Sequence, residues 1–169
     1  MKVILIQPKM NKRPMDTDLK TRMAPSLALL TLISLTPDGH EVIMLNENIE
    51  KIDYNCGAGM VGITITLDVM TRAVQIAKEF RRLGVPVVAG GIHVTSSPDE
   101  CMKYFDAVCV GAAERVWKRI IEDAANCRLQ QVYHDMEGFK GVYANLKIGQ
   151  PAHRKVGQYK YKEMEKQIK

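Results

Sequence analysis

The sequence predicts an α/β domain built on a doubly wound parallel sheet. Short apolar runs alternate along the 169-residue chain with amphipathic helical stretches, which is the pattern of β-α-β units. The apolar runs are continuous rather than alternating with polar residues, which indicates strands buried on both faces. Right-handed crossovers between such strands favour a five-stranded flavodoxin-like (Rossmann-like) sheet in the order 2-1-3-4-5.

Five apolar runs account for the predicted strands, at residues 3–6, 41–45, 60–65, 85–89 and 107–110. A first helix is expected from Pro25, because proline is favoured at the first helical position. A second covers residues 69–83, with apolar residues on one face and charged residues on the other. Ser97-Pro98-Asp99-Glu100 predicts a helix start with Ser97 as its cap, and a last helix is expected over residues 114–125.

Length and composition indicate a single α/β domain, large enough to form one hydrophobic core. Hydrophobic residues make up 46% of the chain and charged residues 25%, the balance of an ordinary globular protein. Residues 1–128 are expected to form the domain, and residues 129–149 to extend the sheet edge, with 131–133 and 141–148 as candidate short strands. Residues 150–169 are expected to form a basic mobile tail or an interdomain linker.

Charge and hydropathy argue against nucleic-acid and membrane partners. The net charge is +5, and residues 154–169 hold six basic residues against two acidic ones, so the rest is nearly neutral. No basic–aromatic stripe points to nucleic acid, and the tail is expected to be a solvated linker. The N-terminal apolar run is too short for a signal peptide or a membrane span, so a cytoplasmic location is expected.

The four cysteines do not predict a metal centre. Their spacing fits neither zinc nor iron–sulfur motifs, so no metal-ligating residue and no iron–sulfur cluster are predicted. Free thiols are expected, with Cys109 as a small core residue of its strand.

Candidate binding residues lie where the predicted strands end. Ligands of open parallel sheets bind beyond the carboxyl ends of the strands, at the point where strand order reverses. Four loops are thereby nominated, and a connection of unusual length, Gln7 to Ala24, belongs to the first of them. The residues at these strand ends are Gln7 and Pro8, then Thr64 and Thr66, then Gly90, Gly91 and His93, and finally Gly111 and Glu114.

Two common ligand classes for this fold are disfavoured. Dinucleotides need a glycine-rich turn after the first strand, and here that turn is Gln7-Pro8-Lys9-Met10. Glu47 stands where a ribose-binding acid would stand, yet without the glycines it carries little weight. A phosphoacceptor receiver domain would need acidic residues at the ends of the first and third strands, and the chain has none there.

Several stretches resemble the N-terminal cobalamin-binding domain of radical S-adenosylmethionine enzymes. The resemblance covers about residues 1–150 and is carried by residues 2–8, 23–30 and 61–64 and by Gly90-Gly91-Ile92-His93-Val94-Thr95. It implies a corrin held on the carboxyl edge of the sheet and a nucleotide tail in a cleft beside the central strands. It also adds Pro25 and Ser26 to the candidate cofactor-binding residues.

Two departures from the family pattern qualify what the resemblance implies. The family often has Gly-Glu-Gly-Glu after the fifth strand, where this chain has Gly111-Ala112-Ala113-Glu114. The Asp-x-His-x-x-Gly motif of other cobalamin domains is absent, so the resemblance implies a base-off cobalamin without a histidine ligand from the first loop. His93 is a candidate substitute ligand, although a hydrogen-bonding loop role is the commoner one for such a residue.

The function expected is that of a cofactor-binding module. The Cys-x-x-x-Cys-x-x-Cys cluster of a radical domain is absent, so the corrinoid would serve methyl transfer or radical chemistry performed by another domain, in cis or in trans. The alternative is an interaction or regulatory domain of the same fold without a cofactor. Independent catalysis is not expected, because no nucleophile–base pair stands in a supporting context.

Overall fold

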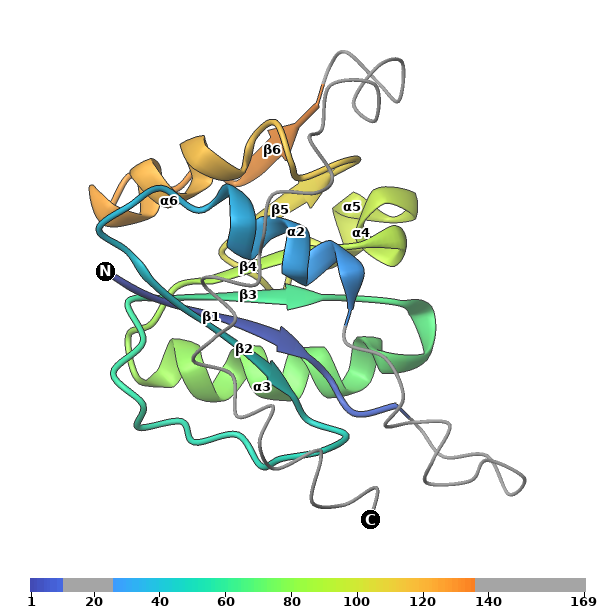
Figure 1. Cartoon of the computed structure of the whole chain (residues 1–169). Coiled ribbons are helices and arrows are strands. Elements are labelled where there is room, and N and C mark those ends of the chain that lie inside the picture. Colours follow the sequence, from blue (N-terminus) through green and yellow to red (C-terminus); the bar gives the residue numbers. More distant parts are fainter. Residues whose placement is uncertain (11–25, 136–169) are drawn as a thin grey trace.

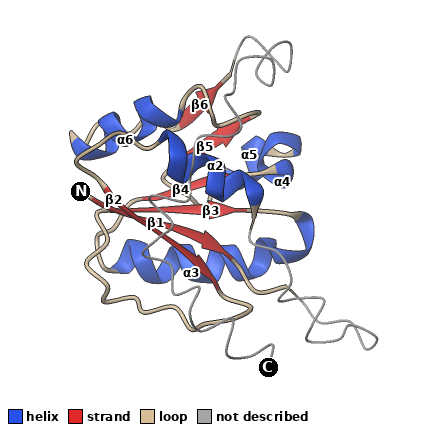
Figure 2. Ribbon diagram, viewed as in Figure 1, coloured by secondary structure: helices blue, strands red, loops and turns tan. Residues whose placement is uncertain are grey.

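The core of the chain is a six-stranded, wholly parallel sheet flanked by helices (Figures 1 and 2). The computed structural model describes residues 1–10 and 26–135. The strand order is β2-β1-β3-β4-β5-β6. The strands are β1 (Lys2–Gln7), β2 (Glu41–Asn46), β3 (Met60–Thr64), β4 (Val87–Gly90), β5 (Ala107–Val110) and β6 (Val132–His134).

The predicted order 2-1-3-4-5 is confirmed, with one strand added at the edge. β6 pairs in parallel with β5, matching Val108 to Val132 and Val110 to His134. The five-stranded prediction was therefore one strand short, although residues 131–133 were a candidate edge strand. The second candidate, residues 141–148, and the tail at 150–169 lie outside the described residues.

β1 is suited to the interior of the sheet, between β2 and β3, because its side chains are apolar on both faces. Its residues 3–6 are at most 3% exposed, and the strand pairs with β2 on one side and β3 on the other. β4 begins two residues later than predicted, at Val87. Pro86 has no N–H to donate, and only its carbonyl contributes, accepting from the Val61 amide at 3.0 Å.

The helices cover the two faces of the sheet unequally. They are α2 (Leu27–Leu35), η1 (Leu67–Val69), α3 (Met70–Arg82), α4 (Ile92–Ser96), α5 (Pro98–Cys101) and α6 (Trp117–Ala125). Side chains of α3, α4 and α5 pack into the core on one face, and those of α2 and α6 pack into the core on the other. Figure 1 shows α3 on one side of the strands and α2 on the opposite side. The chain is thus doubly wound.

The helix start at Ser97-Pro98 is confirmed, but its capping was predicted wrongly. α5 begins at Pro98, yet the Ser97 side chain makes no capping hydrogen bond. Ser97 instead ends α4, a short helix that was not predicted, and its amide donates to the His93 carbonyl at 2.9 Å. Residues 97–100 therefore form a junction between two short helices rather than a capping box.

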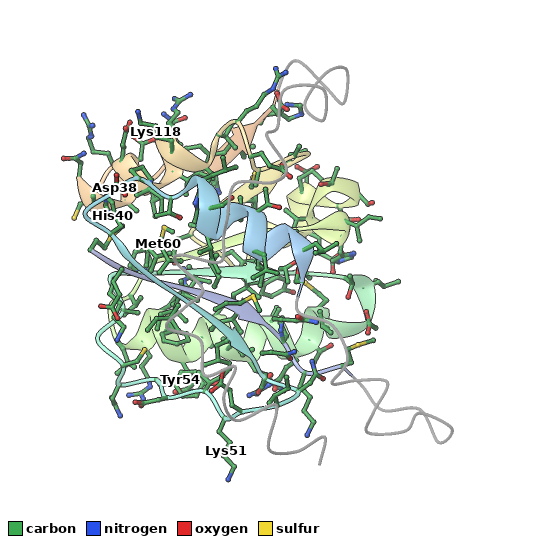
Figure 3. All side chains as sticks on the ribbon, viewed as in Figure 1. Asp38, His40, Lys51, Tyr54, Met60 and Lys118 are labelled. Carbon is green, nitrogen blue, oxygen red and sulfur yellow. The ribbon has the colours of Figure 1, made fainter. Side chains whose placement is uncertain are left out.

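Charged side chains lie on the surface, and the sheet is lined by buried apolar side chains. Figure 3 shows Lys51 projecting away from the ribbon, whereas Met60 lies inside the fold with no exposed surface. No helix among the described residues is long and apolar enough to cross a membrane.

A candidate cofactor cavity at the carboxyl edge of the sheet

A cavity of about 470 Å³ lies between the sheet and the pair of helices α2 and α6. That volume falls within the roughly 300–1,000 Å³ typical of small-molecule sites. The lining is mostly apolar and comes from β1, α2, β3, β4, α4, β5 and α6 and from the loops after β4 and β5. Its apolar inner part is formed by Leu5, Leu29, Leu32, Val88, Trp117 and Ile120.

Register explains how the sheet leaves room for this cavity. Leu5, Gly62 and Val88 are paired across β1, β3 and β4, so they form one row on the face toward α2 and α6. The next row toward the carboxyl edge pairs Thr64 with Gly90. A Cβ on Gly90 would meet only the Cys109 Cβ, at 3.9 Å, so the space above it is open. Gly90 is the point at which the cavity reaches the strand ends.

Gly91 serves the fold rather than the cavity's volume. Its φ is +109°, and an added Cβ would lie 2.7 Å from the Ile65 carbonyl oxygen and 2.8 Å from the Ile65 nitrogen. The Ile65 amide donates to the Gly90 carbonyl at 2.8 Å, and the Ile65 carbonyl accepts from the His93 amide at 3.1 Å. The backbone at Gly91 therefore lies so close to the backbone at Ile65 that only glycine fits there. This contact fixes the turn from β4 into α4.

A few polar groups surround the mouth of the cavity. Thr64, Thr95 and Glu114 line it, and Glu114 is the charged side chain among the lining residues. The Thr95 hydroxyl donates to the Gly91 carbonyl at 3.1 Å and accepts from the Gly111 amide at 3.0 Å. Thr95 was not among the predicted site residues. The sequence offered one signal for it. Thr95 stands four residues after Gly91, and a threonine hydroxyl in a helix can donate to the carbonyl four residues earlier.

The inner end of the cavity is closed by paired polar groups. The Trp117 indole N–H donates to the Thr36 hydroxyl at 2.9 Å, and that hydroxyl donates to the Leu32 carbonyl at 2.7 Å. Cys109 also lines the cavity, and burial raises the pKa of its thiol to about 12, so the thiol is protonated at neutral pH. The interior consequently offers no charge and no spare strong donor.

Four further predicted residues do not line the cavity, namely Gln7, Pro8, Ser26 and Thr66. The Gln7 side-chain oxygen is buried without a hydrogen-bond partner, and Gln7 shares the face of Leu5 because it stands two residues further along β1. Pro8 is buried beside it, and Ser26 directly precedes α2, where its carbonyl accepts from the Leu30 amide at 3.0 Å. The Thr66 hydroxyl donates to the Asp68 carboxylate on the surface. Pro25 lies outside the described residues.

His93 is buried on α4 but does not line the cavity. It is 8% exposed, its Nε2 lacks a hydrogen bond, and that nitrogen lies 3.9 Å from a Glu100 carboxylate oxygen. Its neighbour Val94 packs into the core on the α3 face. The His93 imidazole therefore pairs with α5 in this arrangement.

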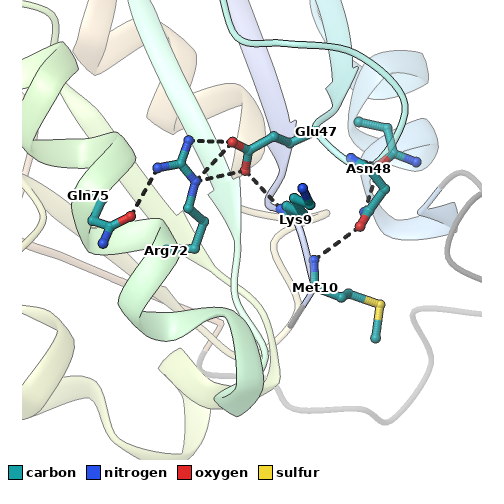
Figure 4. A network of polar contacts seen from close by, with 7 residues as sticks. Lys9, Met10, Glu47, Asn48, Arg72 and Gln75 are labelled. Carbon is teal, nitrogen blue, oxygen red and sulfur yellow. Dashed lines mark hydrogen bonds and ion pairs between the residues drawn. The ribbon is translucent and has the colours of Figure 1, made fainter. Parts of the chain in front are cut away.

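A polar network fixes the chain as it leaves β1 (Figure 4). The Glu47 carboxylate accepts from the Lys9 amide at 2.9 Å and pairs with the Arg72 guanidinium of α3. The Asn48 side-chain oxygen accepts from the Met10 amide at 3.1 Å. Burial alone would raise the pKa of Glu47, but Arg72 and the Lys9 amide outweigh it and hold that pKa below its usual value. Glu47 thus anchors β1, β2 and α3 together.

Large apolar side chains stand exposed beside the mouth of the cavity. Leu27, at the start of α2, is 79% exposed, and Ile92, at the start of α4, is 70% exposed. Ile92 belongs to the cavity lining, and Ala28 beside Leu27 does too. Such exposure is typical of a surface that another apolar group covers.

A doubly wound parallel domain with an apolar cavity at its carboxyl edge belongs to the class of nucleotide- and cofactor-binding α/β domains. Comparison with known families shows which family within this class the chain belongs to. Residues 23–121 match the B12 binding domain, and the chain therefore belongs to that family, as its resemblance predicted.

Two individual proteins are similar to the chain. The bacteriochlorophyllide d C-8(2)-methyltransferase of Chlorobaculum tepidum is 39% identical over 131 residues, which span 77% of this chain and 29% of that protein. The chain thus corresponds to less than a third of that relative's length. The N-terminal domain of a hypothetical protein from Thermotoga maritima has a known structure with a TM-score of 0.41 and 18% identity, covering 51% of this chain and 74% of that one.

Proposed function

We propose that this chain holds a cobalamin, with the corrin on the carboxyl edge of the sheet and the nucleotide tail in the cavity between α2 and α6. The observation that carries the proposal is the 470 Å³ cavity, which opens at Gly90 in a domain of the B12-binding family. The depth of the cavity runs along the sheet face from the Thr64–Gly90 row to the Leu5–Val88 row.

The residues present fit such a cofactor. The open space above Gly90 and the absence of any atom within 4 Å of a Cβ on Gly111 leave room for a broad, flat group against the strand ends. Leu27 and Ile92 offer apolar contact at the mouth. The Thr64 hydroxyl at the mouth is suited to bind one of the amide groups that surround a corrin.

A bound cobalamin would supply a cobalt centre that carries a methyl group for transfer. This chain's own contribution is to hold the corrin and to exclude water from its lower side. Because His93 faces Glu100 and does not line the cavity, we propose a base-off cofactor without a histidine ligand from this chain. Among the described residues no group of three histidine, cysteine or acidic side chains is placed to hold a metal ion.

Catalysis is proposed to reside in another domain. The similar methyltransferase of Chlorobaculum tepidum is more than three times as long as the matched segment, which spans 29% of it. We propose a radical S-adenosylmethionine catalytic domain as the partner, in cis or in trans, within a cytoplasmic enzyme. Methyl transfer is supported over other radical chemistry because that relative is a methyltransferase.

A second candidate function, a cofactor-free interaction domain, rests on one observation. The loop after β5 reads Gly111-Ala112-Ala113-Glu114 and keeps a single acid where the family pattern has two. The apolar residues at the mouth would then serve a protein contact alone.

A titration of the full chain with hydroxocobalamin and methylcobalamin separates the two functions. We expect the corrin to co-elute with the protein on gel filtration and to shift toward its base-off absorption spectrum. Gly90→Val should weaken binding at least tenfold, because the valine would occupy the open space beside Cys109. Thr71→Val, which introduces the same residue on the exposed side of α3, is the control and should bind normally. Lack of retention at high micromolar cofactor would contradict cobalamin binding.

A further inference from the structure

The interior of the cavity has few strong hydrogen-bonding groups, and those it has are already paired. Every side chain of the inner part except Trp117 is aliphatic. The Trp117 N–H is already used by Thr36, and the Thr36 hydroxyl uses its own proton on the Leu32 carbonyl. The backbone of β3, β4 and β5 is committed to the sheet ladder. A group that enters the interior therefore finds contact surface and the weakly polar Cys109 thiol, but no free strong hydrogen-bond donor or acceptor.

The polar groups at the mouth are too far along the strands to serve the interior. Thr64 and Gly90 lie two residues beyond Gly62 and Val88 on their strands. They are therefore the next residues on the same face of the sheet, nearer to its carboxyl edge. The Thr95 hydroxyl is already hydrogen-bonded to the Gly91 carbonyl and the Gly111 amide. Thr64 and Glu114 remain to bind the ribose hydroxyls of a tail that passes them. The cavity is accordingly polar at its mouth and apolar inside.

We infer that the cavity selects cobamides whose lower base is apolar, of the dimethylbenzimidazole or phenol type, over those with a purine base. The inference rests on the proposed function, because it assumes that the base enters the cavity. An adenine would bring an amino group and several ring nitrogens into the interior, where they would lose their hydrogen bonds to water without replacement. A cresol brings only methyl and ring carbons, and a dimethylbenzimidazole adds a single ring nitrogen to such carbons. Both therefore lose fewer hydrogen bonds than adenine and gain from contact with Leu32, Val88 and Ile120.

The test compares four corrinoids on the full chain by equilibrium dialysis. They are cobalamin, a cobamide with adenine, a cobamide with p-cresol, and cobinamide, which lacks the nucleotide. We expect cobalamin and the cresol form to bind at least tenfold more tightly than the adenine form. The cresol form is informative because a phenolic base does not coordinate cobalt, so its binding is free of the cost of displacing the base.

Two variants on one strand give the matched control. Val88→Thr places a hydroxyl of nearly the same shape in the cavity, and it should narrow the difference between the adenine form and cobalamin severalfold. Val87→Thr makes the same change at an equally buried position on the opposite face, among the residues packed against α3. It should leave the ratio unchanged. Unfolding curves for both variants show that each is folded under the binding conditions.

The outcomes separate this inference from the proposed function. Equal or tighter binding of the adenine form, with cobinamide still weaker, would overturn apolar selection while leaving the base in the cavity. Equal binding of all four corrinoids would overturn it by showing that the base stays outside. Absence of binding by every corrinoid would overturn both the inference and the proposed function.

Discussion

The Trp117 indole N–H donates to the Thr36 hydroxyl at 2.9 Å, which joins two residues 81 positions apart in the sequence. Thr36 ends α2, and Trp117 begins α6, so the bond ties together the two helices that enclose the cavity. Trp117 is 2% exposed and Thr36 is 3% exposed. The contact therefore sets the separation of α2 and α6 at the inner end of the cavity.

Thr36→Val should destabilise the chain, because it leaves the buried indole N–H without an acceptor. The expected loss in the free energy of unfolding is about 1–3 kcal/mol. Thr36→Ser keeps the hydroxyl and should lose less, about 1 kcal/mol or below, since only a methyl group is removed. Urea unfolding of both variants measures the difference. Equal stability of the valine and serine variants would contradict this role for the bond.

The sequence predicted the sheet well because local pattern and global topology agree there. Continuous apolar runs such as residues 3–6 are buried on both faces, and right-handed crossovers leave few strand orders. β6 was harder to predict, because its three residues are too few to give a periodic signal. α4 was missed because Ile92 to Ser96 is a five-residue helix whose N-cap is Gly91, which has no side chain to give a capping signal.

The location of the candidate cavity could be predicted from the sequence, but its detailed shape could not. The rule that ligands bind beyond the strand ends nominated Thr64, Gly90, Gly91, Gly111 and Glu114, all of which line the cavity. The inner wall could not be predicted, because it depends on the packing of α2 and α6 across the sheet. No short-range pattern links Thr36 to Trp117 or shows that His93 turns toward Glu100.

The adjacent glycines of β4 and α4 should respond very differently to alanine. Gly91→Ala forces a Cβ to within 2.8 Å of the Ile65 backbone at a φ of +109°. The expected cost is about 2 kcal/mol or more. Gly90→Ala meets only the Cys109 Cβ at 3.9 Å and should change stability by less than about 1 kcal/mol. Thermal and urea unfolding give both values, and a Gly91→Ala variant as stable as Gly90→Ala would refute the close approach.

The four thiols should react with iodoacetamide in an order set by burial. Cys127 is exposed, whereas Cys101 and Cys109 are buried, and burial raises the pKa of the Cys109 thiol to about 12. At pH 8 Cys109 is therefore protonated as well as inaccessible, and alkylation requires the thiolate. Peptide mass spectrometry after short exposure should find Cys127 modified first and Cys109 last. Modification of both at equal rates in the folded chain would contradict the buried position of Cys109.

Glu47→Gln should remove an acid-sensitive part of the stability. The pKa of Glu47 is held below its usual 4.5 in the folded chain. Its charge therefore contributes stability that is fully present above about pH 4.5 and is lost as the pH falls through the lowered folded value. The glutamine variant keeps an acceptor for the Lys9 amide but pairs poorly with Arg72, and we expect it to lose roughly 1–3 kcal/mol at pH 7.

The diagnostic measurement is the difference between the two proteins as a function of pH. Urea unfolding of the wild-type chain and of Glu47→Gln between pH 7 and pH 3 should give curves that converge on acidification, because protonated Glu47 resembles glutamine. Glu50→Gln, at an exposed acid on the same loop, is the control and should run parallel to the wild type. A constant gap between the wild type and Glu47→Gln down to pH 3 would show that the carboxylate's charge does not stabilise this junction of β1, β2 and α3.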